Sequence, residues 1–138
     1  MLKSICAVVV AVVAWFLTAV VGNLLIRAVL PGYTEVEADM NFTLPMKLCR
    51  LALALVASLC AGSVCAAIAD SNRNAAKVLG CGLLLFFLPV HYSLWDKFPV
   101  WYHLFFLVTL APAVLLGSAL YSKLASAKPP AAAQPDAS

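Results

Sequence analysis

The sequence has few charged residues. Only 11% of its 138 residues are Asp, Glu, Lys or Arg, whereas 64% are hydrophobic, and the mean hydropathy is +1.00. A soluble domain carries about a quarter of its residues as charged side chains. The composition therefore excludes a water-soluble domain and predicts a single domain whose main solvent is lipid. The net charge of +3 is too small, and too dispersed, to predict nucleic-acid binding.

Acidic residues are absent from every long apolar run. Four runs, 4–30, 46–69, 75–95 and 100–122, exceed the roughly 20 residues that a helix needs to cross a bilayer. Lipid offers no partner to the backbone of a lone strand, so each run is predicted to be helical. We therefore predict an all-α fold, an integral membrane four-helix bundle over residues 1–123, followed by a disordered Pro/Ala-rich cytoplasmic tail at 124–138. A small proton-coupled exporter is excluded, because it needs a membrane-embedded carboxylate.

A Cys-x-x-Cys motif is also missing, although the chain contains five cysteines. A membrane thiol oxidase needs a reactive cysteine pair near the outer surface. Cys60 and Cys65 instead lie deep in the second run, and their spacing places them off a common helix face. We interpret the cysteines as small packing residues, and we predict neither a metal site nor a cofactor.

The ends of the runs carry stop and start signals. Pro31 and Gly32 end the first run, which is longer than a secretion signal and is expected to be retained. Thr43 is placed to cap the second helix, and Pro45 is tolerated in its first turn. Basic residues slightly favour cytoplasmic termini. With no clear eukaryotic sorting signal, we predict a multi-pass protein of the bacterial inner membrane.

Small residues recur every four positions in the second run, at Ala54, Ser58, Gly62 and Ala66, and the fourth run offers Gly117. Such a stripe lets another backbone approach closely. We expect it to pack inside the bundle. The alternative is that it binds a second copy of the chain or another subunit of a membrane complex.

Each run brings one basic side chain to a common level near the outer side. Arg27 and Arg50 lie roughly 6–7 Å below their helix ends at 1.5 Å per residue, and His91 and His103 lie at similar depths. In one interpretation the arginines snorkel to headgroups and the histidines belong to an aromatic belt at the interface. In another, the four face inward and bind an anion, a lipid headgroup or a quinone carbonyl. In a third, the two histidines ligate a haem.

Four groups that can all be positive should not converge without a negative partner. We therefore expect Arg50 to pair either with Glu35, Glu37 or Asp39 of the connecting segment, or with the head of a bound lipid or ligand.

The function predicted from these patterns is a non-enzymatic structural, accessory or assembly subunit of the membrane. The chain has no nucleophile–base constellation and no phosphate loop. One alternative is a binder or carrier of an amphipathic anion, a lipid or a quinone, and another is a haem-binding electron-transfer subunit. The expected partners are membrane lipids and a homo-oligomer or a larger membrane complex.

The segments FTLPMKLCRLALAL (42–55) and LWDKFPVWYHLFFL (94–107) resemble those of small four-helix inner-membrane proteins of proteobacteria. The resemblance covers residues 1–123 at most. It implies a four-helix membrane fold and directs attention to Arg50 and the Trp-Tyr-His run. It brings no activity with it, because that group has none assigned.

Overall fold

The structure, a computed structural model, describes residues 2–127. This range contains five helices and no strand, which confirms the all-α prediction. The helices are α1 (Leu2–Val29), α2 (Tyr33–Glu37), α3 (Leu44–Ile68), α4 (Arg73–Ser93) and α5 (Val100–Ala127). All except α2 are long and apolar enough to cross a membrane, and they support a multi-pass membrane protein.

The long helices match the four predicted spans, with two corrections at the connections. α5 continues to Ala127, so the start of the predicted disordered tail is helical. Leu124 and its alanine neighbours favour helix, and the Ser126 hydroxyl donates to the Ser122 carbonyl one turn earlier. The rest of that tail, 128–138, lies outside the described residues. The second is α2, a short helix in the segment between the first two spans, for which no helix was predicted.

Local geometry explains the connections. Gly32, before α2, has a φ of +74°, a left-handed value that glycine adopts without steric cost. Asn72 caps α4, because its side-chain oxygen accepts a hydrogen bond from the Asn74 amide at 3.0 Å. Thr43 stands at the cap position of α3 as predicted, but its side chain makes no capping hydrogen bond. Pro45 lies in the first turn of α3, where the helix needs no backbone donor.

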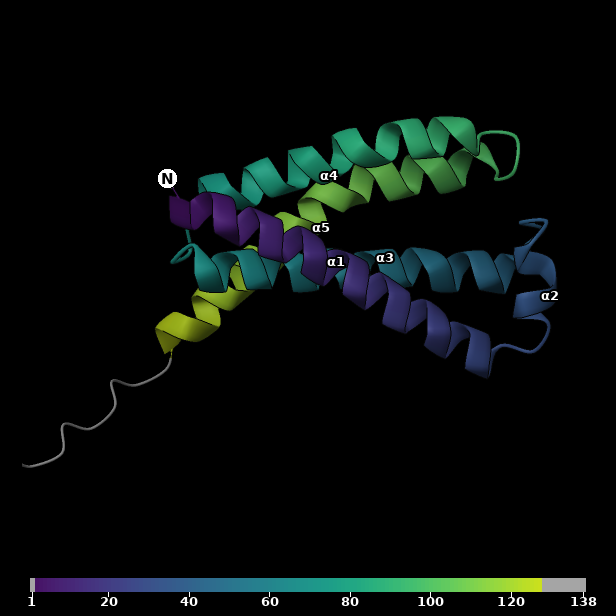
Figure 1. The fold of residues 1–138 in the computed structure, drawn as a ribbon, viewed down its shortest axis with the longest axis horizontal. Coiled ribbons are helices and arrows are strands. Elements are labelled where there is room, and N and C mark those ends of the chain that lie inside the picture. Colours follow the sequence, from purple (N-terminus) through teal and green to yellow (C-terminus); the bar gives the residue numbers. More distant parts are fainter. Residues whose placement is uncertain (1, 128–138) are drawn as a thin grey trace, which may run out of the picture.

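The helices cross at clear angles (Figure 1). α3 packs along both α1 and α5, α4 packs mainly on α5, and contact between α1 and α4 is weaker. α1 and α4 lie close together near the N terminus and diverge towards α2 and the α4–α5 turn. We refer to that side of the molecule as the α2 end. The opposite side, with the N terminus and the α3–α4 turn, is the N-terminal end.

α3 and α5 approach until their backbones touch. A Cβ atom on Gly62 would lie 2.0 Å from the carbonyl oxygen of Val114, and one on Gly117 would lie 2.1 Å from that of Leu59. Glycine is therefore required at both positions. The other members of the small-residue stripe are buried or half-buried. The prediction that this stripe packs inside the bundle is confirmed.

α5 changes partners along its length. Near its middle it packs on α4, where Ala111 lies 3.3 Å from the position of a Cβ atom on Gly80. Beyond this point it packs on α3 through Val114 and Gly117. Pro112 lies at the change, where proline is expected to bend the helix, and Figure 1 shows α5 turning away from α4. α4 and α5 consequently diverge at the N-terminal end (Figure 1).

Candidate functional site

A cavity of about 510 Å³ lies at the α2 end. All four long helices contribute to its lining, together with Glu37 of α2 and Phe98 of the α4–α5 connection. Its lining extends along α1 from Trp15 to Arg27, about 18 Å at 1.5 Å per residue. The cavity thus covers roughly half of a hydrocarbon core about 30 Å thick. Apolar side chains make up most of the lining: Trp15, Phe16, Ala19, Val20, Leu24, Leu53, Ala54, Phe87, Val90, Leu94, Phe98 and Phe106.

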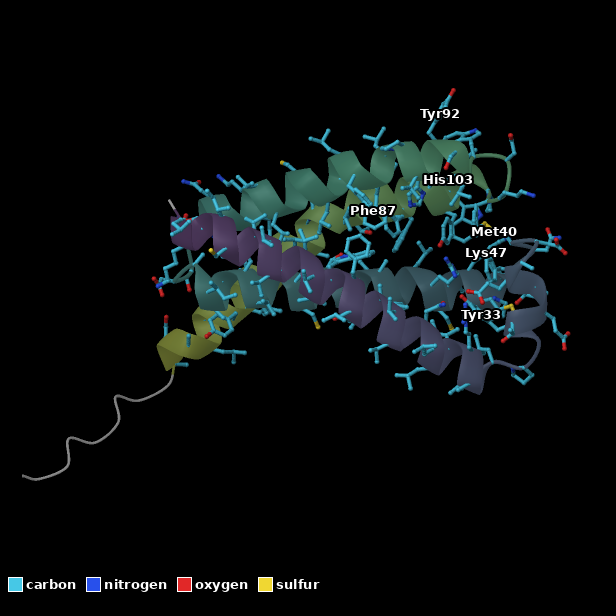
Figure 2. The ribbon with its side chains drawn as sticks, in the orientation of Figure 1. Tyr33, Met40, Lys47, Phe87, Tyr92 and His103 are labelled. Carbon is cyan, nitrogen blue, oxygen red and sulfur yellow. The ribbon has the colours of Figure 1, made fainter. Side chains whose placement is uncertain are left out.

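The four site residues predicted from the sequence all line this cavity. Arg27 comes from α1, Arg50 from α3, His91 from α4 and His103 from α5. Both histidines are buried, Arg50 is half-buried, and the Arg27 side chain is 42% exposed. The histidines therefore do not face lipid, and they pack among aromatic side chains, His103 on Trp95 and His91 on Tyr102. Their place in an interfacial belt stays a prediction. Figure 2 shows Tyr33 on the α1–α3 side of the molecule and His103 on the α4–α5 side.

Arg27 has a carboxylate partner on α2. Its Nη2 atom lies 2.7 Å from Oε2 of Glu37, and the Asn23 amide donates to the other oxygen of Glu37 at 3.3 Å. The hydrogen bond from Arg27 lowers the pKa of the Glu37 carboxyl, and Asn23 adds a smaller effect in the same direction. This pair ties α2 to α1.

Arg50 has no carboxylate partner among residues 2–127. Its Nη1 atom donates a hydrogen bond of 2.6 Å to the Tyr33 hydroxyl, which donates in turn to Asn23 at 2.9 Å. The guanidinium carbon lies 4.7 Å from the centre of the Phe42 ring, a cation–π contact. Within the described range, the buried Nε atom has no hydrogen-bond partner.

The predicted ion pair between Arg50 and an acid of the connecting segment is wrong. Glu37 bonds to α1 instead, and Glu35 and Asp39 are exposed. The reason is α2, which buries Tyr33 completely and presents its hydroxyl to Arg50. The other half of that prediction, a bound head group on Arg50, stays a prediction.

The charges around the cavity do not balance. Glu37 neutralises Arg27, which leaves the formal positive charge of Arg50 uncompensated when the histidines are neutral. An unpaired charge away from water is costly. A negative or strongly hydrogen-bond-accepting group in the cavity would lower that cost.

His91 and His103 face each other across α4 and α5. Their Nδ1 atoms are 2.8 Å apart. One ring must donate and the other accept, so at least one imidazole is neutral. The Nε2 atom of His103 is buried and has no partner within residues 2–127. It is a donor or an acceptor according to the tautomer that the Nδ1 contact selects.

This geometry does not fit a haem held between the two histidines. A metal bonded to two imidazole nitrogens keeps them roughly 4 Å apart, because each bond is about 2 Å long. The Nδ1 atoms are closer than that, and the rings pack on aromatic neighbours, His91 on Phe106 and His103 on Trp95. Within the described part of the chain, no three His, Cys, Asp or Glu residues are grouped to hold a metal ion.

Five buried aromatic rings connect the two halves of the molecule at the α2 end. The series begins at Tyr33 and passes through Phe42, Phe98 and Tyr102 to His91. The distances between successive ring centres are 5.2, 5.9, 4.6 and 6.2 Å. The rings come, in the same order, from α2, the α2–α3 connection, the α4–α5 connection, α5 and α4. This aromatic ladder packs the α4–α5 hairpin against α2 and the segment that precedes α3, beside the cavity.

Tyr33, Phe42 and Asn23 contact Arg50 or Glu37, and these contacts were not predicted from the sequence. Asn23 is the one amide side chain in a long apolar run, and both of its partners, Glu37 and Tyr33, lie on α2. The available signal was the presence of Tyr33 and Phe42 in a connecting segment otherwise rich in acids. The interfacial-belt prediction suits Tyr92, which is 81% exposed and points away from the molecule in Figure 2.

Comparisons with protein-family models, curated proteins and solved structures found no match to the chain. The function therefore has to be inferred from the chemistry of the cavity.

Proposed function

We propose that this membrane protein binds an amphipathic molecule whose head is an anion or carries a carbonyl oxygen, as in a lipid or a quinone. The observation that carries the proposal is Arg50. Its guanidinium lines the cavity without a carboxylate partner in residues 2–127, and its Nε donor is buried and unused. A guanidinium binds planar anionic groups through two parallel hydrogen bonds.

The shape of the cavity suits the apolar part of such a molecule. The basic and polar side chains gather at the α2 end, and the lining towards Trp15 and Phe87 is apolar. α1 and α4 diverge at the α2 end (Figure 1), and side chains of both helices line the cavity there, so a lipid tail would enter between these two helices. Arg50 and His103 would hold the head while the tail lies along α1.

Two binding variants and one control test the proposal. Arg50→Gln removes the head-group partner, and Ala19→Phe fills the apolar part of the cavity. Lys47→Gln is the matched control, because it removes the same charge one turn earlier on α3, outside the cavity lining. Each protein would be purified in a mild detergent and examined by native mass spectrometry, and the bound molecules would be extracted and identified.

The wild type and Lys47→Gln should retain an acidic lipid or a quinone. Occupancy should fall at least tenfold in Arg50→Gln, since a hydrogen bond to a charged group contributes about 1.5–3 kcal/mol. Ala19→Phe should also lose the molecule while keeping its thermal stability. Equal occupancy in the wild type and a folded Arg50→Gln would reject the proposal, as would a wild type that retains only detergent.

For location, we propose a bacterial inner membrane with both termini cytoplasmic, so that the cavity opens into the outer leaflet. A reporter that is active only outside the cytoplasm should be silent when fused at Ser138 and active within 31–45. The reverse pattern would overturn this orientation. A structural, accessory or assembly role in a larger membrane complex stays a prediction.

A further inference from the structure

A second cavity, also of about 510 Å³, lies at the N-terminal end between α4 and α5. It forms because α5 leaves α4 after Ala111 and crosses to α3, where Gly117 packs on Leu59. It shares no lining residue with the cavity at the α2 end.

The lining of this second cavity is basic and hydroxylated. Its polar side chains are three cations and three hydroxyls, Arg73, Lys77 and Lys123 with Ser71, Ser118 and Ser122. No Asp or Glu of residues 2–127 lines it. The acid nearest in sequence, Asp70, is bonded to Lys3 instead.

The three cations lie near the ends of spanning helices, where such helices meet the lipid headgroups. Arg73 is the first residue of α4, Lys77 lies one turn further, and Lys123 lies one turn before the end of α5. Their aliphatic stems can lie along the apolar surface while the charged ends stay in the interface. The cavity wall also includes Leu115 and Ala119, which offer contact to the first part of an acyl chain.

Three like charges around one cavity repel each other, and an anion between them removes that repulsion. We propose that this cavity binds the phosphate headgroup of an anionic phospholipid. Basic pockets between spanning helices bind such headgroups. The lipid comes from the leaflet at the N-terminal end. This site is independent of the function proposed for the cavity at the α2 end, and either can fail without the other.

Lipid titration of the full-length, delipidated protein tests the site. Phosphatidylglycerol, phosphatidylcholine and inorganic phosphate would be added separately, and binding would be followed by native mass spectrometry. The test variant is Lys77→Gln/Lys123→Gln. The control, Lys47→Gln/Lys97→Gln, makes the same charge change at the α2 end, where neither lysine lines a cavity described for residues 2–127. Lys77 and Lys123 contribute no ion pair within the described range, so the variant should keep its melting temperature.

Phosphatidylglycerol should bind the wild type and the control alike. With Arg50→Gln, which removes head-group binding at the α2 end, also present in both variants, the test variant should bind phosphatidylglycerol roughly 30-fold more weakly than the control, because each lysine near a membrane surface contributes roughly fivefold. Arg73→Gln, an independent variant, should weaken binding by roughly fivefold. Equal weakening in test and control variants would overturn the proposal. Equal binding of the two lipids, or binding of inorganic phosphate as tight as that of phosphatidylglycerol, would overturn it as well.

Discussion

The contact between α3 and α5 gives a quantitative prediction for Gly62→Ala. The added Cβ would lie 2.0 Å from the carbonyl oxygen of Val114 and 2.8 Å from its carbonyl carbon. Contacts of a Cβ atom below 3.0 Å essentially do not occur, so α5 would have to move by about 1 Å, from 2.0 to at least 3.0 Å. The opposing atoms belong to the backbone and cannot rotate away. Overpacking of this kind costs about 1–3 kcal/mol, and Gly62→Leu should cost more.

Gly82→Ala is the matched control for this substitution. A Cβ atom on Gly82 meets nothing within 4 Å, and alanine favours helix over glycine. Thermal unfolding in one detergent, followed by circular dichroism, should give a lower Tm for Gly62→Ala than for the wild type. The Tm of Gly82→Ala should be unchanged or higher. A Gly62→Ala protein as stable as the wild type would refute the close α3–α5 contact.

Two further predictions concern side-chain bonds inside the bundle. Arg27 lowers the pKa of Glu37 in the folded protein. Their ion pair therefore stabilises the fold fully above the ordinary Glu pKa of about 4.3, and this stabilisation is lost as the pH falls through the lowered pKa of Glu37 in the folded state. The Tm of the wild type should therefore exceed that of Glu37→Gln at neutral pH and converge with it in acid; a constant difference would contradict the pair. Trp15→Phe removes a buried hydrogen bond of 3.0 Å to Ser58 and should lower the free energy of unfolding by about 1 kcal/mol, whereas Trp101→Phe, at a residue 43% exposed, should be nearly neutral.

The sequence was sufficient to predict the spans and the main helix contact. A long, continuous apolar run in lipid satisfies its backbone hydrogen bonds within itself only as a helix, so four long helices were predicted. The four-residue spacing around Gly62 predicted a close approach, and Gly117 on α5 supplied the complementary position. Depth along each helix also placed Arg50 and His103 at one level, and both line the same cavity.

The hydrogen-bond partners of Arg50, His91 and His103 could not be predicted, because they depend on the rotation of each helix about its axis and on the presence of α2. Lipid is as apolar as a helix interface, so an apolar pattern does not fix which side of a spanning helix faces inward. The 2.8 Å contact between His91 and His103 depends on the rotation of both helices. The choice of Tyr33 over Glu37 as the partner of Arg50 depends on a single helical turn after Gly32.

The central claim is that a head group occupies the cavity beside Arg50, and a crystal structure of the protein purified from its own membrane tests this most directly. The account predicts elongated density between α1 and α4, with its polar end within hydrogen-bond distance of Arg50. A cavity closed by α1 packing on α4, or an Arg50 paired with Glu35 or Asp39 and no density beside it, would contradict the account.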